Sequence, residues 1–190
     1  MVERIVEHGI DKAGTRANRP SKAPHGFQYY DETERRVVTR DGVAGEWLEG
    51  GGAAEAIVTV TTAQILALNA TPVALVAAPG ANKALIFDGA LIWLDYNSAA
   101  YAGIAAGEDL AVKYTDGSGL QVGSCEATSF LDLTADAIRW MNPYRAASGV
   151  SDITPVANAA LVLQMLVGEV ITGNSPLKIR TFYRVVRTAW

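Results

Sequence analysis

The sequence predicts an all-β protein, an antiparallel jelly-roll-like β-sandwich preceded by an N-terminal extended arm with a β-hairpin. Most of the chain consists of short apolar runs separated by Gly, Pro, Asn and Asp, which is typical of strands joined by tight turns. Residues 109–115 alternate between apolar and polar side chains, and Asp116-Gly117-Ser118-Gly119 then leads into 120–128, as in a hairpin. A parallel fold would need a helix of about ten or more residues between its strands. The sequence shows no such alternation of strands with long helices.

The second part of the chain, residues 53–190, is expected to form the sandwich. Thr61-Thr62 offers a helix N-cap, so one short helical turn is expected at 63–68. The run 84–96 is almost continuously apolar except at Asp88-Gly89, which indicates either a central strand with a bulge or a tight hairpin. Residues 134–141 fit a helix or a strand, because periodicity alone does not separate the two. The other expected strands are 57–60, 72–77, 159–167 and 177–186.

Residues 1–52 form a separate and more polar part. Gly50-Gly51-Gly52 is interpreted as a linker, because three consecutive glycines lose much backbone entropy on ordering. The large side chains of this small β-meander are Tyr29, Tyr30 and Trp47, so it needs cover from the sandwich, a symmetry mate or a docking partner. Its expected β-like segments are 27–30, 36–39 and 46–48, with a turn at Asp41-Gly42.

Composition and charge restrict the classes of function. Hydrophobic residues make up 49% of the 190 residues and charged residues 19%, as expected of a folded chain. The net charge is −4 and neither part has a basic excess, which argues against a nucleic-acid partner. The longest apolar stretches are shorter than the roughly 20 residues that span a bilayer, and the charged start does not fit a signal peptide. We therefore expect a cytoplasmically made protein that binds neither nucleic acid nor a membrane.

Residues that commonly carry chemistry are sparse in this sequence. The two histidines, His8 and His25, lie in the polar arm, whereas a Ser-His-Asp or Cys-His system needs one beside a rigid, buried nucleophile. Cys125 alternates with small residues in an expected strand, which indicates a packed thiol, and as the single cysteine it excludes an intrachain disulfide. The sequence contains no metal-ligand spacing and no Gly-rich phosphate loop. It therefore predicts no catalytic residue, no metal and no cofactor.

Two sets of residues are candidates for interaction surfaces. The aromatic residues of the arm predict either a local core or a docking element, because Tyr and Trp are favoured interface anchors. A row of basic residues on the outer side of the last strand predicts either a solvated strand face or a contact with an acidic neighbouring subunit. The aromatic set is Phe27, Tyr29, Tyr30 and Trp47, and the basic set is Lys178, Arg180 and Arg184.

The arm resembles a module found in many tailed-phage virion proteins. Arg19-Pro20 precedes a Gly-x-x-Tyr-Tyr-Asp motif at 26–31, and Asp41-Gly42 and a closing Trp47 follow in the order of that module. Such modules lie near the virion-attached end of fibre-like or head-decorating proteins. The resemblance therefore implies that Arg19, Pro20 and the aromatic set belong to a virion anchor. Residues 34–37 depart from the module, because they are more charged than its usual strand start.

Most of residues 57–186 resemble small phage structural proteins with a jelly-roll-like sandwich. The resemblance rests on four stretches of sequence, and it implies no catalytic residues. It implies a structural virion protein of a tailed phage, a capsid decoration or head-fibre protein that docks on the major capsid protein or neighbouring virion proteins. Proteins of this kind are commonly homotrimers. The four stretches are 61–73, 94–96, 107–110 and 173–180.

Two other functions stay open from the sequence. One is a tail-associated or baseplate-associated adaptor or receptor-binding module, because jelly rolls often present loops that bind a host glycan. The other is a glycan hydrolase that uses a pair of carboxylates such as Asp132 and Asp136. Pairs like these occur by chance in an acidic chain, and the sequence ties neither residue to a cleft.

Overall fold

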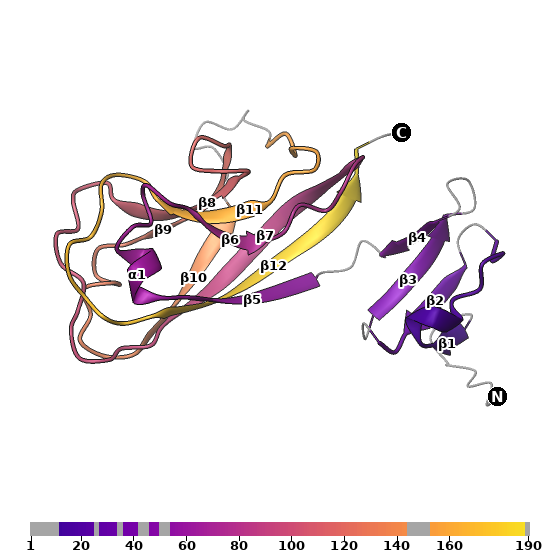
Figure 1. The fold of residues 1–190 in the computed structure, drawn as a ribbon, viewed down its shortest axis with the longest axis horizontal. Helices are drawn as coiled ribbons and strands as arrows, with labels where there is room; N and C mark the ends of the chain where they lie inside the picture. Colours follow the sequence, from indigo (N-terminus) through magenta and orange to yellow (C-terminus); the bar gives the residue numbers. More distant parts are fainter. Residues whose placement is uncertain are drawn as a thin grey trace. The chain divides into compact units, whose positions relative to one another are not determined.

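The computed structural model describes residues 12–24, 27–33, 36–41, 46–49, 54–143 and 153–188. The chain divides into two units, Met1–Gly52 and Ala53–Trp190, and each is considered by itself. Apart from one 3-10 turn and one short helix, the described elements are strands, so the predicted all-β class is confirmed (Figure 1). The turn predicted after Asp41 and the linker Gly50-Gly51-Gly52 lie outside the described residues.

The first unit contains a four-stranded sheet in the order β1-β2-β3-β4. β2 and β3 pair antiparallel as the expected hairpin, β4 adds to β3, and β1 runs parallel to β2. Tyr29 on β2 lies opposite Val38 on β3, and both side chains are buried in the small core of this unit. The sequence does not predict β1, because Lys-Ala-Gly has no strand pattern. The strands are β1 Lys12–Gly14, β2 Gln28–Asp31, β3 Arg36–Asp41 and β4 Glu46–Glu49.

The second unit is an eight-stranded antiparallel sheet that curls onto itself. Its strand order is β5-β12-β7-β10-β9-β8-β11-β6, and the two end strands, β5 and β6, contact each other, so the sheet nearly closes into a barrel-like sandwich. The two long strands β7 and β12 run side by side (Figure 1). The strands are β5 Ala54–Val60, β6 Val73–Val76, β7 Lys83–Leu94, β8 Asp109–Tyr114, β9 Gln121–Glu126, β10 Ala137–Pro143, β11 Leu161–Met165 and β12 Leu177–Arg187.

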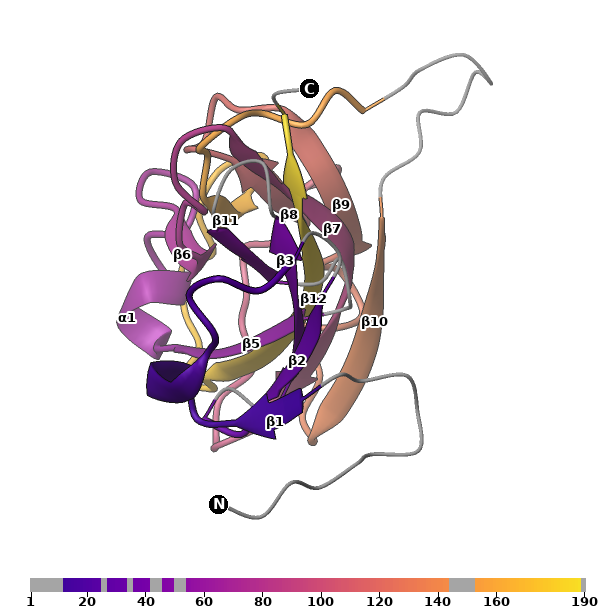
Figure 2. The ribbon, with the colours of Figure 1, turned by 90° about the vertical axis from the view of Figure 1, so that its right-hand side faces the viewer.

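β10 connects the two halves of this curled sheet. Its first five residues pair with β7, and its last two, Asn142 and Pro143, pair with β9. The segment that fits a helix or a strand by sequence is thus a strand. Figure 2 shows α1 beside β6, on the opposite side of the second unit from β10. The side chains inside the curl form one apolar core, whose largest fully buried members are Tyr101, Tyr114, Phe130, Ile65, Leu68, Leu85, Ile92, Leu94, Leu110, Leu131 and Met141.

The expected helical turn is present as α1, Thr62–Ile65. Thr61 and Gln64 form a reciprocal capping box: the Thr61 hydroxyl accepts from the Gln64 backbone N–H, and the Thr61 backbone N–H donates to Gln64 Oε1. This pair satisfies two backbone donors that a helix start otherwise leaves unpaired. Ile65 and the following Leu68 are fully buried, so the turn contributes to the core between β5 and β6.

β7 is one continuous strand with a bulge, and the alternative of a hairpin at Asp88-Gly89 is wrong. Phe182 of β12 pairs with Gly89 and Tyr183 pairs with Phe87, so Asp88 is the extra residue. Side chains alternate between the two sides of a strand, so one extra residue changes which alternate residues face the core. Leu85 and Phe87 point into the core before the bulge, and Ala90, Ile92 and Leu94 point into it afterwards.

Replacing Gly89 tests the bulge. Gly89 has φ of +138°, and a Cβ there would meet the indole ring of Trp140. We expect Gly89→Ala to lower the free energy of unfolding by about 1–3 kcal/mol through backbone strain, and further through displacement of Trp140. Gly80→Ala is the matched control, because Gly80 has φ of +94° and open space at the Cβ position. Equal losses in urea unfolding, with unchanged near-UV circular dichroism, would contradict this account.

Candidate functional site

The outward side of four neighbouring strands carries a group of apolar side chains. On β10, Ile138 is 62% exposed and Trp140 is 48% exposed, and on β5, Ile57 is 61% exposed. Strand pairing places these residues in rows across the sheet with residues of β12 and β7. We call this set the outer face, and it consists of Ile57, Leu91, Trp93, Ile138, Trp140 and Phe182.

The two rows follow directly from the register. One row runs Ile57, Arg180, Leu91 and Trp140, from β5 to β10. The next row runs Thr59, Lys178, Trp93 and Ile138. Directly paired residues in a sheet have neighbouring side chains, so the apolar residues of the two rows form one patch. Arg180 and Lys178 lie within this patch, one in each row.

Trp140 is held in place on the outer face. Its ring occupies the space over Gly89 that any other residue would fill with a Cβ. Phe182 lies opposite Gly89 on β12, and the two ring centroids are 5.6 Å apart at an interplanar angle of 35°. Aromatic rings at this separation attract each other. Trp140 is therefore a large apolar side chain that is both fixed and half-exposed.

The predicted row of basic residues lies on this same side of the sheet, and each member has an acidic partner within the chain. Lys178 Nζ is 2.8 Å from Asp95 Oδ2, and Arg180 NH1 is 3.7 Å from Glu55 Oε2. Lys178 Nζ also lies 4.3 Å from the centroid of the Trp93 ring. Arg184 makes a two-pronged hydrogen bond with Asp88, the bulge residue, with Nε to Oδ2 and NH2 to Oδ1 both at 2.8 Å.

The ion pairs also bear on the two interpretations of the basic row. All six charged groups remain partly open to solvent, which agrees with a solvated strand face. Exposed pairs of this kind contribute about 0–1 kcal/mol each to stability. The hydrogen bond with Asp88 raises the pKa of Arg184 above its ordinary value. Whether a neighbouring subunit contacts this row stays a prediction.

In the first unit, Arg19, Asp31 and Tyr29 join segments that are distant in the sequence. Arg19 Nε donates to Asp31 Oδ2 at 2.7 Å, and the Asp31 carboxylate is fully buried. Asp31 Oδ1 also accepts from the backbone N–H of Thr33 at 2.8 Å. Tyr29 is buried, and its hydroxyl donates to the Thr15 carbonyl at 3.1 Å. Burial raises the pKa of Tyr29, so this hydroxyl keeps its proton.

The remaining arm candidates are placed differently. Pro20, Phe27 and Tyr30 are half-buried. Trp47 lies in β4, and its side chain is outside the described part of the structure. Of the predicted aromatic set, Tyr29 thus fits the local-core interpretation, whereas Phe27 and Tyr30 retain surface that a partner could contact.

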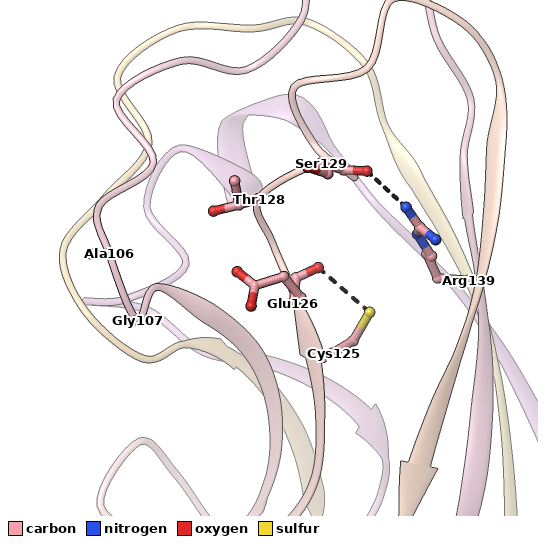
Figure 3. Close-up of a pocket in the computed structure, with 7 residues that line it drawn as sticks. All are labelled: Ala106, Gly107, Cys125, Glu126, Thr128, Ser129 and Arg139. Atoms are coloured by element: carbon pink, nitrogen blue, oxygen red, sulfur yellow. Dashed lines mark hydrogen bonds between the residues drawn. The ribbon is translucent and has the colours of Figure 1, made fainter.

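A solvent-open pocket of 560 Å³ lies between β9, β10 and the loop before β8 (Figure 3). Arg139 NH2 donates to the Ser129 carbonyl at 2.8 Å, and its guanidinium carbon is 5.9 Å from the centroid of the Phe130 ring. Arg139 therefore braces the turn after β9. The lining residues are Ala106, Gly107, Cys125, Glu126, Thr128, Ser129 and Arg139.

The pocket does not assemble an activated nucleophile. Burial raises the pKa of the Cys125 thiol, and this outweighs the opposite effect of Arg139. A thiol with a raised pKa holds little of the thiolate that attacks an electrophile. None of the residues that line the pocket is a histidine. The sulfur also lies 3.7 Å from the Glu126 carbonyl, as a weak donor would.

The carboxylates that suggested a hydrolase lie elsewhere. Asp132 and Asp136 are exposed, and neither lines this pocket. Asp136 Oδ1 accepts from the backbone N–H of Tyr96 at 2.9 Å, which joins the turn before β10 to the end of β7. His8 and His25 lie outside the described residues. Within the described part, no three Cys, His, Asp or Glu side chains are grouped so that they could hold a metal ion.

Comparison of the chain with protein-family models, curated proteins and solved structures gave no match. Among the helices of the described residues, none combines the length and the apolar character needed to cross a bilayer.

Sequence reasoning missed most of the outer face. Ile138 and Trp140 alternate with the inward-facing Ala137 and Met141, but this signal is informative only once the segment is known to be a strand. Leu91 and Trp93 stand in an almost wholly apolar run, where the outward residues look like the inward ones.

Asp109 on β8, opposite Glu126 on β9, gives a pH-dependent test of the stability of the second unit. Burial raises its pKa, and the charge and hydrogen bond of the facing Glu126 raise it further, whereas the Ala127 backbone lowers it. The folded state therefore holds this proton more tightly than the unfolded state, and stability falls as pH rises through the folded pKa. We expect Asp109→Asn to raise the melting temperature at pH 7 and to have little effect at pH 3.

Asp132→Asn makes the same charge change on an exposed turn. It is expected to stay within about 0.5 kcal/mol of the parent at both pH values. A destabilised Asp109→Asn variant at pH 7 would show that the Asp109 carboxylate is needed as an anion.

Removing Arg19 tests the internal framework of the first unit. Arg19→Ala removes the guanidinium that pairs with the buried Asp31 carboxylate, and removing one partner of a buried ion pair commonly costs about 3–5 kcal/mol. We expect hydrogen exchange to lose protection in β2 and β3 while the second unit is unchanged. Lys22→Ala, at an exposed turn, is the matched control. Equal protection in the two variants would show that Asp31 does not depend on Arg19.

Proposed function

We propose that this protein is a non-catalytic structural component of a tailed-phage virion, a capsid decoration or head-fibre protein. Its first unit would dock on the major capsid protein or a neighbouring virion protein, and its second unit would oligomerise and project. The observation that carries the proposal is the outer face, where Ile57, Ile138 and Trp140 are each about half-exposed or more. The sequence resemblance at 14–48 and 57–186 supports the virion as its location.

The outer face supports assembly because a contiguous apolar patch is unfavourable in water. Burial of apolar surface is worth about 25 cal/mol per Å², and large exposed patches mark interaction sites in folded proteins. Aromatic anchors that are already fixed lose little further side-chain entropy on binding. Trp140, seated over Gly89 and against Phe182, has this property.

The first unit supports the anchor assignment in a different way. Arg19, Tyr29 and Asp31 of the phage-like module act here as internal supports, through Arg19 with Asp31 and Tyr29 with Thr15. A unit this small needs such supports, because it can bury little apolar surface. The module is thus a rigid platform, and its docking contacts would come from side chains that retain surface, such as Phe27 and Tyr30.

The alternative is a tail-associated or baseplate-associated adaptor or receptor-binding module for a host glycan. One observation favours it: the exposed indole ring of Trp140 offers an apolar, flat surface of the kind that binds a sugar ring. The pocket beside Arg139 has no comparable aromatic surface among its lining residues. We therefore rank this function second.

Locating the chain on particles tests the proposal. Particles purified from cells that carry the gene should contain the chain, and cryo-electron microscopy should show its density on the head at capsid symmetry axes. Antibody labelling of the same particles gives an independent readout. Density on the tail alone would favour the adaptor, with saturable binding on a glycan array as its own test. Absence of the chain from the particles would overturn both assignments.

A further inference from the structure

We propose that the outer face is where a second copy of this chain binds, so that two copies pack sheet against sheet. This inference deepens the proposed function and rests on it, since it names the surface through which the second unit assembles. Three features of the face carry it: its apolar content, its balanced charges and the way its aromatic rings are covered.

The apolar content comes from strands that already form a regular surface. β5, β12, β7 and β10 are neighbours in the order of the sheet, and each contributes outward apolar side chains. Two sheets pack face to face about 10 Å apart, with their strand directions within about 30°, when both faces carry such side chains. The outer face therefore offers apolar side chains on four neighbouring strands, against which a second sheet could pack.

The charges on the face indicate that the partner is the same chain. Three basic groups and three acidic groups lie on this side of the sheet, in the pairs Lys178 with Asp95, Arg180 with Glu55, and Arg184 with Asp88. A partner of strong single charge, such as nucleic acid or an acidic protein, would meet as much repulsion as attraction. A second copy brings both signs, and a two-fold contact places equivalent patches against each other. Such a contact makes a dimer, in place of the homotrimer that the sequence resemblance implies.

The covering of the aromatic rings disfavours a sugar as the occupant. Lys178 Nζ lies over the Trp93 ring, so this ring does not present a free surface for stacking. Trp140 is flanked on its own strand by Ile138, and Ile57 lies in the same row of the sheet. Branched aliphatic side chains cannot form the hydrogen bonds that a sugar needs. They do pack well against the apolar face of another protein.

Charge variants of the full chain provide the decisive test. If two copies bind through this face, mixing variants of opposite charge should restore the association that each variant loses alone. Glu55→Arg replaces the Arg180–Glu55 pair with two basic groups, and Arg180→Glu replaces it with two acidic groups. We expect each variant alone to self-associate at least about tenfold more weakly than the parent, measured by analytical ultracentrifugation. An equimolar mixture of the two should regain association, because a basic face then meets an acidic one.

Apolar variants provide the second test and its control. Ile138→Asp puts a charge at a 62% exposed position on the outer face, so the fold should tolerate it while association weakens at least about tenfold. Val167→Asp makes the same kind of change at a 50% exposed position outside the outer face and should leave association unchanged. Circular dichroism should give parent-like spectra for both variants.

Several results would overturn the inference. The parent could stay at the single-chain mass of 20.1 kDa up to its solubility limit. The outer-face variants could keep the oligomeric mass of the parent, which would place the contact on another surface. Hydroxyl-radical labelling could find Trp140 protected in a monomer, which would mean that another part of the same chain covers the face.

The particle experiment separates this inference from the proposed function. A chain that sits on virions but does not associate through the outer face retains the proposed function and loses the inference. A chain that associates through the outer face but is absent from virions retains the inference about the outer face and loses the proposed function.

Discussion

The extra residue in β7 is the constraint on which the second unit depends. β7 and β12 pair over their full length, and a regular strand of that length would turn half of its large apolar side chains outward. Because Asp88 has no partner on β12, Leu85 and Phe87 on one side of it and Ile92 and Leu94 on the other all reach the core. The core is therefore continuous along the longest strand.

The same bulge also organises the surface. Gly89 leaves the space in which the Trp140 ring lies, and Asp88 projects outward to receive the two-pronged hydrogen bond of Arg184. One backbone irregularity thus closes the core on the inner side and orders an aromatic ring and an ion pair on the outer side. Bulges that redirect side chains in this way are common next to functional surfaces.

The two units are stabilised by different means. The first unit has little apolar surface, and a buried ion pair between Arg19 and Asp31 supports its hairpin. Removing one partner of such a pair is costly, so Arg19 and Asp31 are constrained by their structural role. The second unit has a large apolar core, and the ion pairs on its outer side contribute little to stability. Those groups are free to serve recognition, as the proposed assembly requires.

The sequence by itself determined the class of fold, most strand positions and the capped turn at Thr61, because alternation, turn residues and capping act between residues close together in the chain. It located the basic row but not the apolar face around it. Inward and outward residues are indistinguishable in an apolar run such as that of Leu91 and Trp93. Only the tertiary structure decided which side of each strand is buried, because Trp140 meets Gly89 and Arg19 meets Asp31 through pairing between distant segments.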